Sequence, residues 1–375
     1  MRFVATADWQ LGMPGSFLPD EARARFAQAR IDVVRRIGEV AAEYRADFVV
    51  VAGDVFDSNQ LHRSVVARAF DALADWPVPV YLLPGNHDCL DAASIYRSAE
   101  FTGAVPDGVR VLDAPGVYEA TEGVELVAAP WFGKRPLTDL VADVLADLPE
   151  SSGRRRVLIG HGGLLGIDRD DPAAIDLSAL TSALTDRRID VAILGDRHST
   201  TEVADRLWYP GAPEVTRHRE TDPGQVLVVD LDEHSGGVEI TPVRVGRWSF
   251  LTHEAPMNGD TDLDDLERDL DRLPDKHLTV VRLTLTGTLT IPQRARLDEL
   301  LARAADRFAH VFVWQRRSEL AVRGDAADFG ELGLTGFAAD AVAELTEELN
   351  GPTAEEAADA RGLLYRLTGA AEAGR

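Results

Sequence analysis

The sequence predicts an α/β fold, and three observations lead to this prediction. Five short runs of β-branched or aliphatic residues occur in the first two hundred positions, and each stops at a polar or glycine-rich turn. Stretches with helical spacing of apolar residues separate the first three runs. Aspartate, asparagine or histidine follows every run. Such alternation indicates a sheet with helices on its faces, whose functional loops gather beyond the carboxyl ends of the strands.

The expected elements alternate along the N-terminal half of the chain. The five runs expected to form strands are Phe3–Ala5, Phe48–Ala52, Val78–Leu83, Val157–Ile159 and Val191–Leu194. Helices are expected over Glu21–Tyr44 and Ser64–Trp76, where apolar residues recur at approximately helical intervals. Two further runs, Val109–Leu112 and Val124–Ala128, predict either strands of a second sheet layer or an antiparallel extension.

The chain is long enough for two domains and an appended tail. The expected parts are a first domain over residues 1–247, a capping domain over 248–335 and a helical tail over 336–375. The first domain should close with a hairpin of residues 225–232 and 238–245. The expected cap elements are helices over Asp262–Leu273 and Ile291–Phe308 and strands over Leu278–Thr286 and Val311–Gln315. From Ala338, two amphipathic helical stretches are expected on either side of Gly351.

The composition excludes several classes of protein. A formal charge of −24 argues against a protein that coats nucleic acid nonspecifically, because such binding rests on Lys and Arg. A DNA enzyme remains compatible, since carboxylates at a metal site are neutralised by the bound cations. The acid is concentrated in Glu254–Asp275, expected to be a solvated helix face. The N-terminus lacks an export signal, which predicts a cytoplasmic protein without a membrane partner, and the lone Cys89 is expected to be a buried filler.

The side chains that follow the five runs are typical of a metal centre. They are Asp8, Asp54 and Asp57, Asn86, His87 and Asp88, His161, and Asp196 and His198. Carboxylate, amide oxygen and imidazole together suit Mn²⁺, Fe or Zn²⁺. Two ions about 3.5–4 Å apart could clamp a phosphodiester and activate a water, with Asp54 as the bridging ligand. The competing interpretation is five unrelated loop turns, and the joint placement of the donors favours the metal centre.

At these positions the chain resembles the calcineurin-like metallophosphoesterases. Three motifs, Thr6–Trp9, Gly53–Asp57 and Tyr209–Glu214, narrow the resemblance to the SbcD-type DNA repair nucleases over most of residues 1–245. The resemblance implies a four-layered α/β/β/α sandwich with a small cap. It also implies an Mn²⁺-dependent DNA exonuclease and endonuclease that acts in double-strand-break repair with an SbcC-type coiled-coil ATPase. Mg²⁺ is the alternative metal, and a homodimer is one candidate for the oligomeric state.

The resemblance also implies the ligands of two ions. The first ion would be held by Asp8, Asp54 and His198, and the second by Asp54, Asn86, His161 and the position of Asp196. Two positions depart from the family pattern, because Gln10 and Asp196 stand where the family has histidines. Oxygen donors in place of imidazole would favour Mn²⁺ or Mg²⁺ over Zn²⁺. Gln10 is either a ligand or a loop residue that hydrogen-bonds to the backbone.

Catalytic roles are predicted for His87 and Asp88. His87 would protonate the leaving oxygen, and Asp88 would orient its imidazole; a purely structural histidine is the alternative. The candidate phosphate contacts are Arg63, Arg197, Arg217, His218 and Arg219, whereas Arg154–Arg156 should lie at the opposite end of its strand. Trp131 either lines the groove or belongs to the core.

The tail and the reaction itself have alternative interpretations. The tail residues Phe337, Val342, Leu345 and Leu349 could pack on the cap or dock on the ATPase as a helix in a groove. One rival function is a phosphodiesterase for a nucleotide or another small molecule. Another is a scaffold subunit whose metal site has decayed, with Gln10 and Asp196 as traces of that loss.

Overall fold

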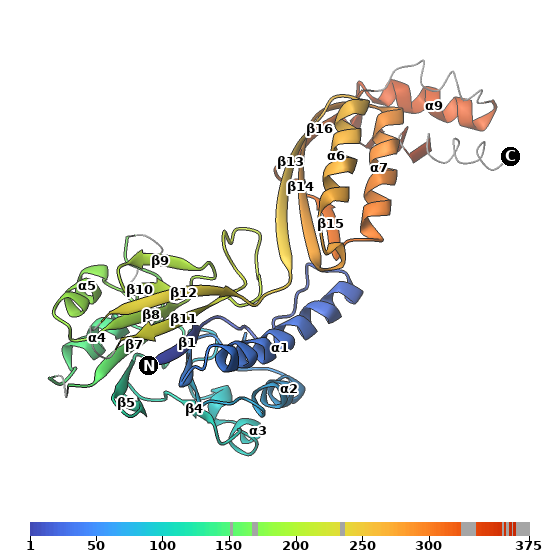
Figure 1. Cartoon of the computed structure of the whole chain (residues 1–375). Coiled ribbons are helices and arrows are strands. Elements are labelled where there is room, and N and C mark those ends of the chain that lie inside the picture. The colour runs from blue at the N-terminus through green and yellow to red at the C-terminus, as the bar shows by residue number, and fades with distance from the viewer. Residues whose placement is uncertain are drawn as a thin grey trace. The chain divides into compact units, whose positions relative to one another are not determined.

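The computed structural model divides the protein into two units, Met1–Trp248 and Ser249–Arg375 (Figure 1). It describes residues 1–150, 153–166, 172–232, 237–323, 335–354, 356–357, 360–361 and 363–364. Among these residues, no helix is both long enough and apolar enough to span a membrane.

The first unit contains two six-stranded sheets. The first sheet has the order β12 (Val238–Arg244), β11 (Gln225–Leu231), β1 (Arg2–Thr6), β2 (Phe48–Ala52), β3 (Val80–Leu83) and β4 (Val109–Val111). The second has the order β5 (Gly116–Thr121), β6 (Val124–Ala128), β7 (Arg155–His161), β8 (Val191–Gly195), β10 (Leu207–Tyr209) and β9 (Thr201–Ala204). Strands β1 to β4 are parallel to one another, as are β6, β7 and β8.

Helices cover the outer face of each sheet, which makes four layers (Figure 1). The helices are α1 (Asp20–Glu43), α2 (Arg63–Leu73), α3 (Ala99–Thr102), α4 (Leu140–Ala146) and α5 (Leu177–Thr185), with a 3₁₀ turn at Ile95–Arg97. One apolar core lies between α1, α2 and the first sheet, a second between the sheets, and a third between the second sheet and α4 and α5. The expected α/β/β/α sandwich is therefore confirmed.

Strand β2 shows why its sequence is continuously apolar. Val49 and Val51 pack against the helices, whereas Phe48, Val50 and Ala52 face the second sheet. Both faces of the strand are buried, so polar residues cannot alternate with apolar ones.

The five expected strand runs are all strands, but they are divided between the two sheets. The first three belong to one sheet and the last two to the other. The expectation of a second layer for Val109–Leu112 is wrong, because β4 pairs with β3 in the first sheet. Strands β5 and β9 and helices α4 and α5 were not expected; each has nine residues or fewer, which gives only a short periodic signal.

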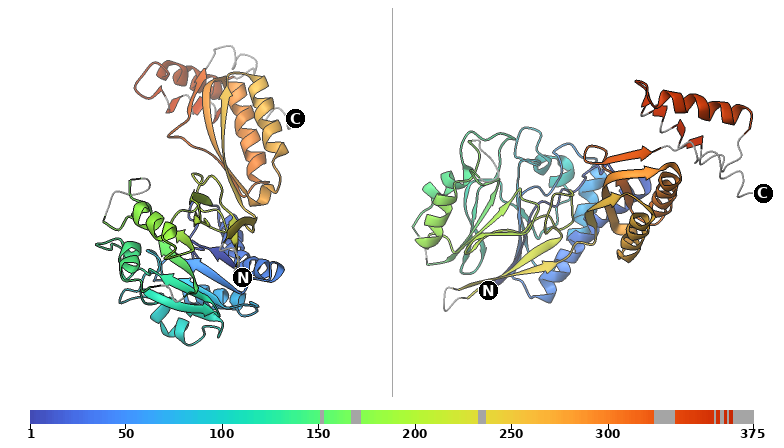
Figure 2. Two further views of the ribbon diagram at one scale, coloured as in Figure 1. Left: turned by 60° about the vertical axis from the view of Figure 1, so that its left-hand side comes forward. Right: turned by 90° about the horizontal axis from the view of Figure 1, so that it is seen from above.

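The second unit is built on a four-stranded parallel sheet. Its elements are β13 (Ser249–Met257), α6 (Asp260–Arg272), a 3₁₀ turn at Lys276–Leu278, β14 (Thr279–Thr290), α7 (Ile291–Ala305), β15 (His310–Val313), β16 (Glu319–Arg323) and α9 (Phe337–Glu348). Helices α6 and α7 lie side by side on one face of the sheet (Figure 2). Strand β13 was not expected. The second helical stretch expected in the tail lies largely outside the described residues.

The acidic segment on α6 is only partly a solvated face. Arginines of α7 and of the turn that follows it pair with this segment, in the contacts Arg296–Asp260 (3.1 Å), Arg303–Glu267 (2.8 Å) and Arg307–Asp271 (2.6 Å). The acidic residues of α6 therefore connect two helices of the same unit.

Candidate metal centre

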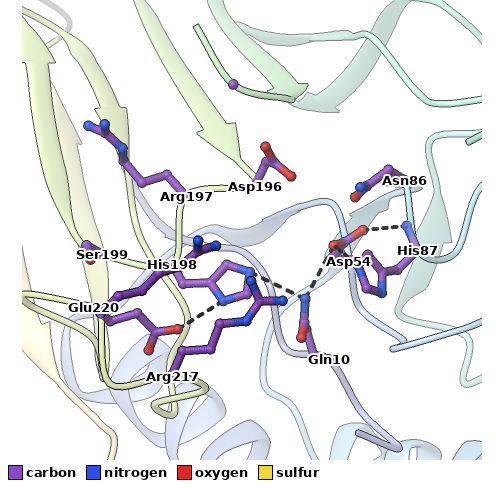
Figure 3. Close-up of a pocket in the computed structure, with 12 residues that line it drawn as sticks. Gln10, Asp54, Asn86, His87, Asp196, Arg197, His198, Ser199, Arg217 and Glu220 are labelled. Atoms are coloured by element: carbon purple, nitrogen blue, oxygen red, sulfur yellow. Dashed lines mark hydrogen bonds and ion pairs between the residues drawn. The ribbon is translucent and has the colours of Figure 1, made fainter. Parts of the chain in front are cut away.

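The loops that follow β1, β2, β3, β7 and β8 meet at one edge of the sandwich. Ligand atoms of Asp8, Asp54 and His161 lie within 4.8 Å of one another, and all three residues are buried. The remaining predicted donors that line the adjoining pocket are Gln10, Asn86, Asp196 and His198 (Figure 3). The structure thus brings together donors from two sheets.

Three aspartates at this edge have left-handed backbone conformations. Asp8 has φ 55°, Asp54 φ 54° and Asp196 φ 90°, and each lies just beyond the end of a strand. Residues other than glycine rarely adopt this region, and such strain is concentrated at functional sites. The turn at Asp8 is held by a hydrogen bond from its N–H to the Gly53 carbonyl oxygen at 3.0 Å.

Two glycines allow the loops of the two sheets to approach. A Cβ on Gly53 would lie 2.1 Å from His161 Nδ1, and a Cβ on Gly195 would lie 1.8 Å from the Ala52 carbonyl oxygen. Both distances are far shorter than van der Waals contact, so any side chain would separate the sheets here. The glycines before the predicted ligands therefore serve close packing.

His161 is held by the main chain. Its Nδ1 lies 2.9 Å from the Ala52 carbonyl oxygen, so Nδ1–H donates there and Nε2 faces the acidic cluster. Nε2 lies 3.4 Å from Asp54 Oδ1 and 3.9 Å from Asp196 Oδ1. Burial lowers the pKa of His161, but the carboxylates of Asp54, Asp8 and Asp196 outweigh it and raise the pKa to about 9.

Asn86 completes this half of the centre. Its terminal amide atom lies 2.9 Å from His161 Nε2 and 3.1 Å from both carboxylate oxygens of Asp54. With nitrogen at this position the amide donates to these acceptors. With oxygen there, amide, carboxylate and imidazole donors converge as they would around a cation.

His198 is held by side chains. Its Nδ1 lies 2.7 Å from Thr216 Oγ1 and 3.1 Å from Glu220 Oε1. Burial lowers the pKa of His198, but the hydrogen bond to Glu220 and the Asp8 carboxylate raise it above its ordinary value. Burial raises the pKa of Glu220, but the hydrogen bond and charge of His198 together with the hydrogen bonds from Thr216 outweigh it and lower the pKa. A carboxylate behind an imidazole in this way orients a metal-ligating histidine.

Gln10 points into the centre. Its Nε2 lies 3.5 Å from Asp54 Oδ2 and 3.4 Å from His198 Nε2, and the residue is buried (Figure 3). Rotation of the amide would present its oxygen at the same place. The Gln10 side chain therefore lies between Asp54 and His198, two predicted ligands of the first ion. The alternative prediction was a hydrogen bond from Gln10 to the backbone of its own loop, and the observed contacts are with side chains instead.

The acidic cluster carries an energetic cost in the absence of a cation. Burial raises the pKa of Asp8 to about 7, although His198 and His161 oppose the shift. The Asp196 N–H lies 3.1 and 3.2 Å from the two carboxylate oxygens of Asp8. Several buried carboxylates directed at one another are electrostatically unfavourable until a positive charge joins them. The residues present therefore fit divalent cations.

His87 lies at the rim of the cluster. Its backbone N–H donates to Asp54 Oδ1 at 2.9 Å, and its Nε2 lies 3.9 Å from Asp54 Oδ2. Nδ1 lies 2.8 Å from the Asp57 carbonyl oxygen, and the side chain is 36% exposed. The imidazole is thus anchored on one side and open to the pocket on the other.

Asp88 does not orient His87 as expected. Its carboxylate accepts from the Gly85 and Phe56 N–H groups and from the Tyr96 hydroxyl, at 2.7, 3.1 and 2.6 Å. Burial raises the pKa of Asp88 to about 6. Asp88 therefore ties together the loops after β2 and β3, and the Asp57 carbonyl holds the imidazole instead.

Three residues that support the centre, Thr216, Glu220 and Arg30, were not predicted from the sequence, whereas Trp131 was predicted with two alternative places. Glu220 and Thr216 hold His198, and no motif there marks them as its partners. Trp131 belongs to the core, and its Nε1 donates to the His161 carbonyl oxygen at 2.7 Å. Buried Arg30 of α1 donates to the carbonyl oxygens of Trp9 and Val215, which ties the two sides of the centre together.

The centre opens into a pocket of about 540 Å³. Of the predicted phosphate contacts, Arg197, Arg217 and Arg219 line it, whereas Arg63 and His218 are not among its lining residues. Arg155 and Arg156 lie at the start of β7, the end away from the centre, and pair with Asp190 and Glu125.

Comparisons with known proteins identify the family. The model of the calcineurin-like phosphoesterase family matches residues 1–229. The uncharacterized metallophosphoesterase YhaO of Bacillus subtilis (strain 168) is 33% identical over 98 residues, which cover 24% of each chain. The SbcD component of the nuclease SbcCD from the same organism is 32% identical over 98 residues, 25% of this chain and 24% of the relative. The match thus spans about a quarter of these relatives' length.

Two solved structures are among those that align with this chain. A dimetal phosphatase from Danio rerio is 15% identical with a TM-score of 0.37, covering 65% of this chain and 99% of that one. A purple acid phosphatase from yellow lupin (Lupinus luteus) is 12% identical with a TM-score of 0.39, covering 65% and 51%. The family match spans more than half of the chain, including β1 to β8 and every predicted ligand. The chain therefore belongs to the calcineurin-like phosphoesterase family, whose members hydrolyse phosphoesters with divalent metal ions.

Proposed function

We propose that this protein is an SbcD-type DNA nuclease, an exonuclease and endonuclease that acts with an SbcC-type ATPase in double-strand-break repair in the cytoplasm. The observation that carries the proposal is the buried donor cluster at the floor of an open pocket with a histidine at its rim. The partial similarity to the SbcD component of the nuclease SbcCD supports the choice of substrate.

The proposed ligands form two overlapping sets around Asp54. Asp8, Gln10 and His198 would hold one ion with Asp54, and Asn86, His161 and Asp196 would hold the other. Mn²⁺ is the preferred metal and Mg²⁺ the alternative, because oxygen atoms make up most of the set. When bound, two such ions supply Lewis acidity and an activated water for attack on phosphorus.

The chain's own contribution to the reaction is orientation and a proton. Nδ1–H of His87 donates to the Asp57 carbonyl oxygen, which leaves Nε2 on the pocket side of the ring. Protonated at Nε2, His87 can donate to the departing sugar oxygen. Asp88 keeps this loop in place through its three hydrogen bonds.

The tail helix α9 is proposed as the ATPase-binding segment. Phe337 at its start is 88% exposed, and Val342 and Leu345 are half-buried on the same short helix. An amphipathic helix of this kind can enter an apolar groove of a partner.

The test is Mn²⁺-supported cleavage of linear and hairpin DNA by the parent and by His87→Ala and Asp54→Ala. Both variants should lose cleavage, but only Asp54→Ala should also lose metal, measured by mass spectrometry of the purified protein. A parent that binds metal but cuts only small phosphodiesters would indicate a nucleotide or small-molecule phosphodiesterase. A parent that binds no metal would indicate a scaffold protein and end the proposal.

A further inference from the structure

Two exposed arginines stand beside the centre on the loop between β10 and β11. Arg217 and Arg219 both line the pocket, and both are exposed. Figure 3 shows the Arg217 side chain next to these two residues, whereas Asn86 and His87 lie across the pocket. Arg217 therefore flanks the side of the centre that is remote from the proposed proton donor, and Arg219 lies two residues further along the same loop.

Arg217 and Arg219 are distinguished by their place at the pocket, since other exposed arginines of the described first unit, such as Arg110, also form no ion pair but do not line it. Arg2, Arg36, Arg155 and Arg156 all pair with carboxylates, as an acidic chain of charge −24 readily allows. Within the described part of the chain, the structure gives neither Arg217 nor Arg219 an ion pair. Two guanidinium groups that line a pocket beside a candidate metal centre, and that form no ion pair, are placed to meet an anionic ligand from outside the chain.

The loop that carries them is anchored at both ends. The Thr216 N–H donates to Glu220 Oε2 at 2.8 Å, and the Glu220 N–H donates to the Arg217 carbonyl oxygen at 3.3 Å. Thr216 and Glu220 also contact the His198 imidazole. The arginine side chains thus project from a turn whose position is tied to a predicted metal ligand.

We propose that Arg217 and Arg219 form a subsite for the phosphate adjacent to the scissile one. This inference rests on the proposed function, because it assigns the centre a substrate with at least two consecutive phosphodiesters. The planar guanidinium group matches the geometry of phosphate oxygens and carries its charge at every physiological pH. The subsite lies on the His198 side of the scissile phosphate, so the leaving group would lie on the His87 side.

The test compares a thymidine dinucleotide, which has one phosphate, with a thymidine trinucleotide, which has two. The parent enzyme with Mn²⁺ should have a kcat/KM at least about tenfold higher for the trinucleotide. In the double variant Arg217→Ala/Arg219→Ala this ratio should fall to near one. The matched control is Arg110→Ala, an exposed arginine of β4 outside the pocket, which should keep the parental ratio. If the double variant also kept the parental ratio of the two kcat/KM values, the proposed subsite would be wrong.

A binding measurement tests the subsite without turnover. A fluorescent single-stranded oligonucleotide is titrated against metal-free parent and double variant over a series of salt concentrations. Loss of the one phosphate contact that the two arginines share should reduce the slope of log K against log salt by roughly 0.7. An unchanged slope would contradict the subsite even if the parent proved unable to cut DNA, whereas a parent that cuts neither oligonucleotide nor long DNA would contradict the proposed function.

Discussion

The two histidines of the centre are held in different ways. His161 is fully enclosed, and its Nδ1 is bound by a main-chain carbonyl group. His198 is bound by two side chains, Thr216 and Glu220, and its Nε2 meets Gln10 beside the open pocket. A main-chain carbonyl oxygen is present whatever the side chain of Ala52, whereas Glu220 can be replaced by mutation. If the two histidines hold the two proposed ions, the comparison predicts sites of unequal rigidity, with the more easily weakened site on the His198 side.

The largest expected effect comes from the residue that both halves share. Asp54 contacts His161 on one side and Gln10, the neighbour of His198, on the other, so Asp54→Ala should remove both proposed ions rather than one. Phosphodiester cleavage should fall at least ~10³-fold, about 4 kcal/mol of transition-state stabilisation. Metal content and single-turnover rates check this, with Asp71→Ala on the surface of α2 as the control. If the Asp54→Ala variant kept one ion, Asp54 would not be a ligand shared by both ions.

The second-largest expected effect is that of Glu220→Gln, which should change metal binding on the His198 side of the centre and not on the His161 side. Glu220→Gln removes the carboxylate behind His198 but leaves His161 and Ala52 unaltered. Affinity for one ion should weaken about 10–100-fold while the other stays unchanged. Calorimetric titration with Mn²⁺ resolves the two steps, and Glu202→Gln on exposed β9 is the matched control. Equal weakening of both steps would contradict the division into halves.

The pH dependence of the metal-free protein reports on the His161 half. The neighbouring carboxylates outweigh burial and raise the pKa of His161 to about 9 from its ordinary 6.5. The protonated form therefore stabilises the fold fully below pH 6.5, and this stability is lost as the pH rises through 9. The loss should be roughly 1–3 kcal/mol. The Tm of the protein freed of metal by a chelator should fall as the pH rises from 6.5 to 9, and it should fall less in the His161→Gln variant. Identical Tm profiles for parent and variant would show that His161 is not the source of the pH dependence.

The smallest expected effect concerns Gln10. Gln10→His places an imidazole between Asp54 and His198, where the amide now lies. Nitrogen in place of oxygen favours Zn²⁺, so Zn²⁺ retention should rise about fivefold to tenfold on the His198 side alone. Competition between Zn²⁺ and Mn²⁺ measures this change. An unaltered metal preference would show that position 10 does not coordinate.

The fold could be predicted from the sequence to a large extent. Continuous apolar runs such as Phe48–Ala52 marked buried strands, and the donors after them marked the functional edge. These signals are local, since they depend on residues within one element and its turn. Short elements such as α5 lacked enough residues to show a period, and the assignment of β4 depended on strand pairing.

The features of the metal centre likewise fall into those that the sequence predicts and those that depend on the tertiary structure. The sequence by itself determined which residue types stand at the strand ends, and therefore that a donor set for divalent cations exists. Only the tertiary structure decided that donors from two sheets meet, that Asp88 binds Tyr96 and main-chain N–H groups, and that Glu220 lies behind His198. The physical reason is that these contacts join residues far apart along the chain, and their geometry depends on how the two sheets pack.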